Sequence, residues 1–222
     1  MNYECILLAA GEGQRANLGY NKVLYKIGGR KEIVLYSLEY FLSDPLCMKI
    51  ILVINPRDKF YFHNLIKSPK VVFTYGGSTR GESVHNGLLL ADSDYVIVHD
   101  SARPLIYKED VFNLLQAAPE TGGATLATKV YNTTCLIEDG YVKDYFSRHT
   151  LASLITPQCF NKAKLEEAYK KASVDGVSFT DDSGIFKAYS GAVKLVFTNN
   201  VSIKVTTSYD IKLLEVIFNE NR

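Results

Sequence analysis

Residues 5–15 read Cys-Ile-Leu-Leu-Ala-Ala-Gly-Glu-Gly-Gln-Arg, and this stretch decides the fold. An apolar run of strand length passes directly into a glycine-containing loop. Further apolar runs lie at 49–54, 71–74, 95–99 and 124–129; segments with apolar residues at helical spacing lie between them, at 32–42, 59–66, 83–91 and 108–117. Apolar strands that alternate with helices are typical of a parallel α/β sheet covered by helices on both faces. We therefore predict an α/β fold.

The segment 131–145 interrupts this alternation. It reads as a strand, a turn at 138–140 and a second strand, which is the pattern of a β-hairpin. A hairpin arm that leaves a compact body must bury its apolar side, and a second subunit is the simplest partner. Helices are expected at 162–172, 182–189 and from Ser208, with strands at 193–197 and 201–204. We expect one domain, 1–222, with an arm at about 131–148.

Composition narrows the class of protein. The 222 residues are 47% hydrophobic and carry 25 Lys and Arg against 24 Asp and Glu, a balance that excludes disorder and lacks the basic excess of a nucleic-acid binder. No stretch reads as a signal peptide or a membrane span. The four cysteines form no CxxC pair, and the four histidines show no metal-ligand spacing. We expect free thiols, no zinc site, and a cytoplasmic protein that binds neither nucleic acid nor membrane.

The loop after the first strand is a candidate phosphate site, because ligands of α/β sheets bind beyond the carboxyl ends of the strands. Gly11 and Gly13 let backbone N–H groups approach a phosphate closely. Their spacing also fits a loose dinucleotide fingerprint, but Glu32 opens a helix where a nicotinamide cofactor needs an acid at a strand end. Arg15 and Lys22 add two cations, which suits a triphosphate that loses pyrophosphate. A purely structural turn remains the alternative for this loop.

Two further loops follow strands at the same edge. In the segment 75–84, Gly76 and Gly77, the cation of Arg80 and a hydroxyl that could cap the helix at 83–91 make a second close-approach site. Asp100 ends an apolar strand, a common place for a carboxylate that holds Mg²⁺ beside phosphates. A helix-capping or salt-bridge role is the alternative for Asp100. Three such loops at one sheet edge favour a nucleotide site.

A family resemblance runs in order through the chain, from about residue 3 to 217. It is carried by Ala9-Ala10-Gly11-x-Gly13-x-Arg15, Asn21-Lys22, Gly76-Gly77-x-x-Arg80-x-x-Ser83-Val84, Val98-His99-Asp100-x-Ala102-Arg103-Pro104, Thr156-Pro157-Gln158, Thr180-Asp181-Asp182 and Ile203-Lys204-Val205-Thr206-Thr207. These segments resemble the 2-C-methyl-D-erythritol 4-phosphate cytidylyltransferase family. The resemblance implies a Rossmann-like nucleotidyltransferase three-layer sandwich whose protruding β-arm joins two subunits.

The resemblance also implies a reaction. CTP and 2-C-methyl-D-erythritol 4-phosphate would give 4-diphosphocytidyl-2-C-methyl-D-erythritol and pyrophosphate, with Mg²⁺, in the non-mevalonate isoprenoid pathway. In-line displacement at the α-phosphorus is catalysed mostly by positioning and charge neutralisation. The family's enzymes work as homodimers, so the expected partners are CTP, a phosphorylated sugar alcohol and a second copy of the chain.

Residue roles follow from the same resemblance, position by position. The catalytic cations are Arg15, Lys22 and Lys204. The residues that contact CTP are Ala9, Ala10, Gly11, Gly13, Gly77, Ser83 and Asp100, of which Asp100 also lies near the metal. The residues that bind the acceptor are Arg103, Thr133, Arg148, Thr180 and Asp181, with Thr133 and Arg148 reaching the neighbouring subunit's site. An arginine can grip a phosphate through two parallel hydrogen bonds.

Six positions depart from the family pattern, among them Val23 in place of a Gln and Ser78 in place of a frequent acid. Asn21 stands where many members have Pro, and Ser202 stands where they have Asn. On the acceptor side, Asn132 replaces an Asp and Cys135 replaces a Lys. The phosphate cations are kept, so the chemistry is expected to survive, whereas the changes on the acceptor side leave the identity of the acceptor open.

Two other functions therefore stay open at this point. One is a ribitol 5-phosphate cytidylyltransferase, although Ala9-Ala10-Gly11 and Ala102-Arg103 favour methylerythritol phosphate because ribitol enzymes more often carry Ala-Gly-Gly and a Val before the Arg. The other is a non-catalytic nucleotide-binding homologue. The intact Arg15, Lys22, Asp100 and Lys204 argue against that one.

Overall fold

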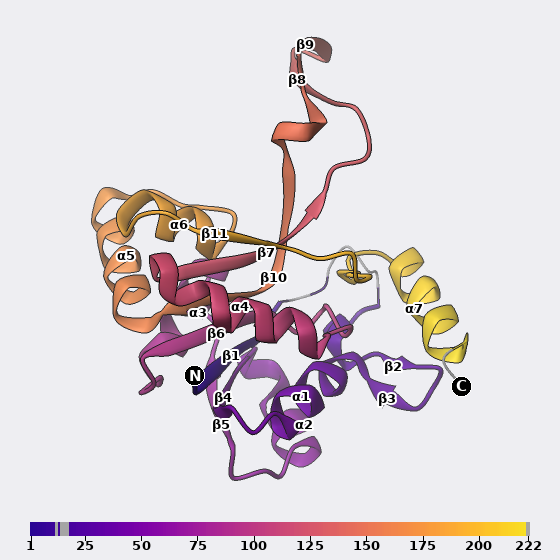
Figure 1. Ribbon diagram of the computed structural model, residues 1–222. Helices are drawn as coiled ribbons and strands as arrows, with labels where there is room; N and C mark the ends of the chain where they lie inside the picture. The colour runs from indigo at the N-terminus through magenta and orange to yellow at the C-terminus, as the bar shows by residue number, and fades with distance from the viewer. Residues whose placement is uncertain (12, 14–17, 221–222) are drawn as a thin grey trace.

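A seven-stranded sheet organises the molecule in this computed structural model, which describes residues 1–11, 13 and 18–220 (Figure 1). The strand order is β11-β7-β10-β6-β1-β4-β5. The bounds are β1 Tyr3–Ala9, β4 Cys47–Ile54, β5 Val71–Tyr75, β6 Tyr95–Asp100, β7 Gly123–Lys129, β10 Ala152–Asn161 and β11 Lys194–Phe197.

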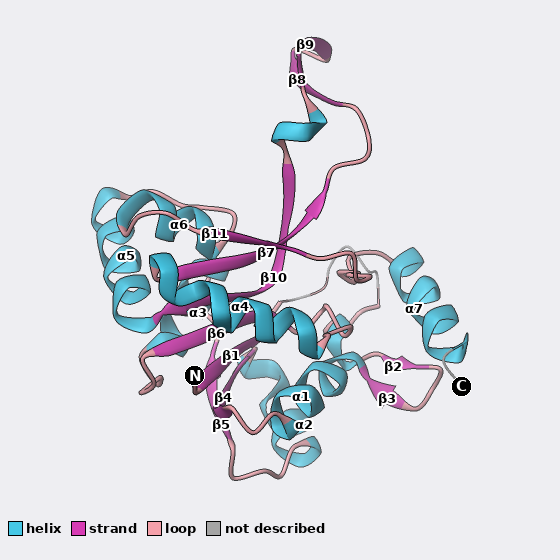
Figure 2. Cartoon of the chain, viewed as in Figure 1, coloured by secondary structure: helices cyan, strands magenta, loops and turns pink. Residues whose placement is uncertain are grey.

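Helices cover both faces of this sheet, so the predicted three-layer α/β sandwich is confirmed (Figure 2). One face packs against α1 Ile33–Ser43, α2 Lys59–Leu65, α4 Lys108–Thr121 and α7 Ser208–Glu220. The other packs against α3 Arg80–Leu88, α5 Lys162–Asp175 and α6 Asp182–Tyr189. The alternation of β1 makes this possible, because Cys5 and Leu7 join the first core and Ile6 joins the second.

The sheet is mixed, which corrects the prediction of a parallel one. β1 pairs in parallel with β4 and β6, but β10 runs antiparallel to both β6 and β7. β10 had no counterpart among the predicted strands. Conversely, the expected strand at 201–204 is not formed in the described chain: this segment lies near the end of β6 through single side-chain contacts, such as the hydrogen bond from the Arg103 guanidinium to the Ser202 hydroxyl (3.1 Å).

The predicted hairpin is confirmed as an arm that projects from the body (Figure 1). β8 Thr134–Glu138 pairs antiparallel with β9 Tyr141–Phe146, and the turn residues Asp139 and Gly140 both have positive φ. Two successive positive φ values are typical of the two-residue turns that match strand twist. A short 3₁₀ turn, Arg148–Thr150, leads from the arm into β10.

Several smaller elements were not predicted. The 3₁₀ turn Lys22–Leu24 follows the first loop, and β2 Lys26–Ile27 pairs with β3 Lys31–Glu32 in a small separate hairpin. A further 3₁₀ turn, Pro56–Asp58, follows β4. Among the described residues, no helix is long and apolar enough to cross a membrane.

Candidate active site

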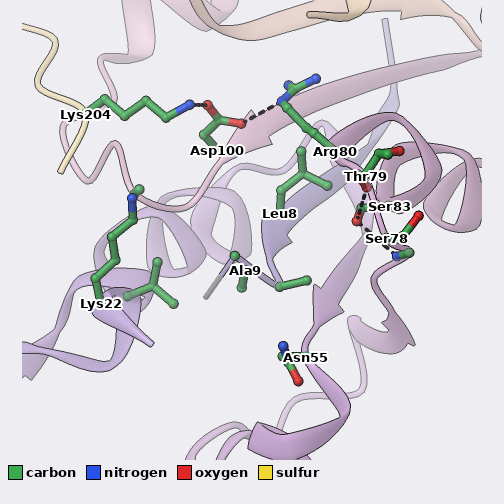
Figure 3. Close-up of a pocket in the computed structure, with 15 residues that line it drawn as sticks. Leu8, Ala9, Lys22, Asn55, Ser78, Thr79, Arg80, Ser83, Asp100 and Lys204 are labelled. Atoms are coloured by element: carbon green, nitrogen blue, oxygen red, sulfur yellow. Dashed lines mark hydrogen bonds and ion pairs between the residues drawn. The ribbon is translucent and has the colours of Figure 1, made fainter. Parts of the chain in front are cut away.

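The loops after β1, β5 and β6 meet at one edge of the sheet and enclose a cavity of about 610 Å³ (Figure 3). Parallel strands bring their carboxyl ends to the same edge, which is why segments so far apart in sequence converge. The lining residues are Leu8, Ala9, Ala10, Gly11, Lys22, Val23, Asn55, Gly77, Ser78, Thr79, Arg80, Ser83, Asp100, Ala102 and Lys204.

Lys22 is placed in this cavity by its neighbour Asn21. The Asn21 side-chain amide donates to the Ala9 carbonyl (2.8 Å) and to the Asp58 carboxylate (2.9 Å), and its Oδ1 accepts from the Val23 N–H (3.3 Å). Asn21 is buried, so these contacts satisfy a polar group that would otherwise be costly. One side chain thus fixes the start of the Lys22–Leu24 turn against the end of β1.

The loop after β5 comes very close to the loop after β1. A Cβ at Gly76 would lie 2.4 Å from the Ala10 Cβ, so only glycine permits this approach. The Gly77 N–H donates to the Ser83 hydroxyl (3.1 Å), which donates in turn to the Thr79 carbonyl (2.9 Å). The hydroxyl that caps α3 is that of Thr79, which accepts from the Glu82 N–H. Ser83 instead braces the glycine loop.

Asp100 lies between two cations at the end of β6 (Figure 3). Its Oδ2 is 2.6 Å from the Lys204 Nζ, and its Oδ1 is 3.3 Å from the Arg80 Nε. Burial of Asp100 raises the pKa of its carboxyl, but the charges of Arg80 and Lys204 outweigh burial and hold that pKa well below its usual range. Asp100 is therefore an anion.

A second cavity, of about 360 Å³, adjoins the first. Arg80, Asp100 and Lys204 line both, so these three charged side chains form a shared wall. The remaining lining residues are Arg103, Leu154, Ile155, Thr156, Gln158, Thr180 and Asp181. Two adjoining cavities with a charged wall between them suit two substrates that react with each other at that wall.

Most of the predicted site residues are brought together. Ala9, Ala10, Gly11, Lys22, Gly77, Ser83, Asp100 and Lys204 line the larger cavity, and Arg103, Thr180 and Asp181 line the smaller one. Gly13 lies against Lys22: its φ is +67° and a Cβ there would lie 3.0 Å from the Lys22 backbone nitrogen. Arg15 lies outside the described residues.

Thr133 and Arg148 are not brought to the cavities of their own chain. Both are exposed on the arm, and the Arg148 guanidinium donates to the Tyr131 carbonyl (3.3 Å). Neither is among the described residues that line the two cavities.

Three residues of this site had been given no role of their own from the sequence. Arg80 is part of the shared wall, the Thr156 hydroxyl accepts from the Asp100 N–H (3.1 Å), and the Gln158 amide donates to the Asp181 carboxylate (3.0 Å). All three stand inside segments that carried the family resemblance, which was the available signal. Their partners lie 20 to 56 residues away, so their contacts required the fold.

Asp100 fits the requirements of a Mg²⁺ ligand. Magnesium is commonly held by one or two carboxylates together with water and substrate phosphate oxygens. Asp100 is ionised, lines the cavity and has a further lone pair on each oxygen. The described residues contain no cluster of three or more His, Cys, Asp or Glu side chains that could hold a metal alone, so most ligands would come from the nucleotide and water.

The chain has a Rossmann-like sheet, glycine loops and lysines around one cavity, and a charged wall that this cavity shares with a second one. This combination of fold and site defines a nucleotidyltransferase. The family model described as 2-C-methyl-D-erythritol 4-phosphate cytidylyltransferase matches residues 4–220. A protein of that name from Geobacillus thermodenitrificans is 34% identical over 222 residues, covering 98% of this chain and 97% of its own. The chain belongs to the 2-C-methyl-D-erythritol 4-phosphate cytidylyltransferase family.

Solved structures agree with this assignment. The 4-diphosphocytidyl-2C-methyl-D-erythritol synthase of Anaerococcus prevotii matches with a TM-score of 0.86 at 28% identity, covering 98% of this chain and 96% of its own. The 2-C-methyl-D-erythritol 4-phosphate cytidylyltransferase of Francisella tularensis matches with a TM-score of 0.84 at 26% identity, covering 97% of this chain and 99% of its own.

Proposed function

We propose that this chain transfers the cytidylyl group of CTP to 2-C-methyl-D-erythritol 4-phosphate and releases pyrophosphate. The observation that carries the proposal is the shared wall of Arg80, Asp100 and Lys204 between two cavities. CTP would occupy the larger cavity, which contains Lys22 and the glycine loops. The acceptor would occupy the smaller one, beside Arg103 and Asp181.

The chemical step is an in-line displacement at the wall. A phosphate oxygen of the acceptor attacks the α-phosphorus of CTP, a new P–O bond forms, and the bond to the β-phosphate oxygen breaks. Lys22 and Lys204 line the same cavity, so both can stabilise the charge that develops on the α-phosphate. Mg²⁺ on Asp100 would add charge neutralisation at the triphosphate.

The glycine loops would also receive the base of CTP. A Cβ at Gly76 would lie 2.4 Å from the Ala10 Cβ, so the loops after β1 and β5 meet there, and Ala9, Ala10 and Gly77 line the larger cavity. In the proposed complex, the cytosine would lie against these small residues.

The arm supports a homodimer. Its exposed apolar side chains are Tyr131, Leu136, Ile137, Tyr141, Val142, Tyr145 and Phe146. Apolar side chains gathered on a projecting arm mark an interaction surface. In the proposed dimer, Thr133 and Arg148 of each arm reach the acceptor cavity of the partner subunit, because they are distant from the cavities of their own chain.

The free thiols fit a reducing compartment. Cys5, Cys47, Cys135 and Cys159 are all unpaired in the structure, as predicted. Since cytosolic proteins rarely carry disulfides, a cytoplasmic location is the natural proposal.

Pyrophosphate release tests the proposed function. Purified protein with CTP and Mg²⁺ would be given 2-C-methyl-D-erythritol 4-phosphate, ribitol 5-phosphate or no acceptor. Release is expected with the first acceptor only, and the cytidine diphosphate product should be identified by mass. Release with ribitol 5-phosphate alone would contradict the proposed acceptor. No release with either acceptor would contradict the proposed cytidylyltransferase activity.

A further inference from the structure

Arg80 is the first residue of α3, and its guanidinium lies between two carboxylates. The Nε is 3.3 Å from Asp100 Oδ1, and the Nη2 is 2.8 Å from Asp182 Oδ2. The second contact is an ion pair without the alignment of a hydrogen bond. Arg80 thus connects the end of β6, where the two cavities meet, with the start of α6.

Asp182 is a fully buried carboxylate outside both cavities. It begins α6, is 0% exposed, and is not among the described residues that line either cavity. The Tyr169 hydroxyl of α5 donates to its Oδ1. A buried charge is costly unless it is paired and hydrogen-bonded, so Arg80 and Tyr169 together make this position tolerable.

The two partners of Arg80 also determine how it meets Asp100. Because Asp182 draws the end of the guanidinium away, Arg80 contacts Asp100 through Nε alone, and Asp100 Oδ2 stays with Lys204. An arginine released from Asp182 could form the two parallel hydrogen bonds that guanidinium and carboxylate prefer. It would then compete with Lys204 for Asp100.

We propose that Asp182 and Tyr169 are positioning residues for cytidylyl transfer: they hold Arg80 back from Asp100 and so keep Lys204 in place at the wall between the cavities. This inference rests on the proposed function. Neither residue touches substrate; both act through Arg80.

The test compares two Tyr→Phe variants. Tyr169→Phe removes the hydroxyl that supports Asp182. Tyr189→Phe removes the hydroxyl of α6 that donates to Asp175 of α5 (2.8 Å), so it breaks a tyrosine–aspartate hydrogen bond between the same two helices without touching Arg80. Tyr169→Phe should lower kcat about three- to tenfold with KM for CTP within about twofold, and Tyr189→Phe should change both by less than about twofold.

A second readout does not depend on turnover. The side-chain Nε–H resonance of Arg80, assigned with an Arg80→Lys sample, should exchange faster with water in Tyr169→Phe and in Asp182→Asn, but not in Tyr189→Phe. An unchanged Arg80 resonance in both variants would overturn the positioning role, and so would equal losses of kcat in the two Phe variants.

These outcomes separate the two proposals. Wild-type protein without cytidylyl transfer contradicts the proposed function, whatever the resonance shows. If the wild type is active and Tyr169→Phe keeps full kcat, the result contradicts the positioning role and leaves the proposed function intact. If Asp182→Asn does not fold, Tyr169→Phe still decides the matter.

Discussion

Single residues in this site work because neighbouring groups fix their charge and place. Asn21 ties the backbone beside Lys22 to β1 and to Asp58, so the lysine enters the cavity from a rigid turn. A cation held in place before the reaction stabilises developing charge without the cost of reorganisation.

Lys22→Ala should therefore affect turnover far more than folding. We expect kcat to fall by at least about a hundredfold, as when one preorganised charge-stabilising group is lost, with a shift in thermal midpoint of no more than a few degrees. Lys26→Ala is the control, since Lys26 is half exposed on β2 and pairs with Glu32 at 3.6 Å. Steady-state pyrophosphate release with both variants checks this, and near-normal kcat in Lys22→Ala would remove the lysine from the catalytic group.

The ionisation of His99 links pH to the stability of the fold. Burial lowers its pKa from the usual 6.5 to about 4, against the opposing effect of a hydrogen bond with the Arg103 carbonyl (3.0 Å). In the unfolded chain, His99 therefore binds a proton below about pH 6.5, whereas in the native state it binds one only below about pH 4. This contribution to stability is full above pH 6.5 and is lost as the pH falls toward 4.

At about pH 5 the loss amounts to about 2 kcal/mol. Urea unfolding of the wild type at about pH 7.5 and about pH 5 should show it, and His99→Gln should lose less stability over the same interval. His149→Gln, at an exposed position on the arm, is the control and should behave as wild type. An equal loss in His99→Gln and wild type would mean that other groups cause the acid sensitivity.

At the level of elements, the sequence predicted what is local and missed what depends on distant pairing. Runs of apolar residues predicted β1, β4, β5, β6 and β7 close to the positions at which the structure has them. β10 was missed because Pro157 lies inside it, and proline argues against a central strand. The structure accommodates it with a register shift between Ile155 and Gln158 in the pairing with β7.

The candidate site follows the same division. Ligands of an α/β sheet bind at the loops that follow the strands. The sequence therefore predicted the glycines, Lys22 and Asp100 as site residues, because they stand in or next to such loops. The role of Arg80 could not be predicted, because its ion pair with Asp182 joins α3 to α6, which cover the same face of the sheet but lie far apart in sequence. Sequence spacing carries no information on such a contact.

The contact between two loops gives a prediction for an element. Gly76→Ala would place a Cβ 2.4 Å from the Ala10 Cβ and 3.0 Å from the Ser83 Oγ, so the loop after β5 must move. We expect KM for CTP to rise about tenfold, with a smaller change in KM for the acceptor, because only the nucleotide end of the site is displaced.

A second substitution makes this test specific. Ala10→Gly removes the methyl group that the new Cβ would meet, so the double variant Ala10→Gly, Gly76→Ala should recover part of the lost CTP affinity. Initial rates at varied CTP for the wild type, both single variants and the double variant form a double-mutant cycle. Strictly additive effects would contradict a clash between these two positions.

At the scale of the whole molecule, the arm keeps Arg148 out of the two cavities of its own chain. The chain leaves the sheet after β7, forms the projecting arm and returns through β10 (Figure 1). Arg148 begins the 3₁₀ turn just before β10 and lines neither cavity. A two-fold dimer would return each arm to the other subunit. Under that arrangement, Lys22 and Arg148 in one working site belong to different chains.

Hybrid dimers test this arrangement directly. Lys22→Ala and Arg148→Ala proteins should each be nearly inactive at low acceptor concentration, the second because its KM for the acceptor rises while KM for CTP stays nearly unchanged. When the two are unfolded, mixed in equal amounts and refolded together, half of the dimers are hybrids, and one site in each hybrid has both residues intact. The mixture should then recover up to about a quarter of wild-type activity.

Recovery of this kind has no explanation in a site built from one chain, because every such site in the mixture would keep one substitution. Refolded samples of each single variant provide the baseline, and a tagged pull-down confirms that hybrids have formed. If hybrids form and activity stays at the baseline, Arg148 acts on its own subunit or not at all. If activity returns, pairing through the arm is a requirement of catalysis and not only of assembly.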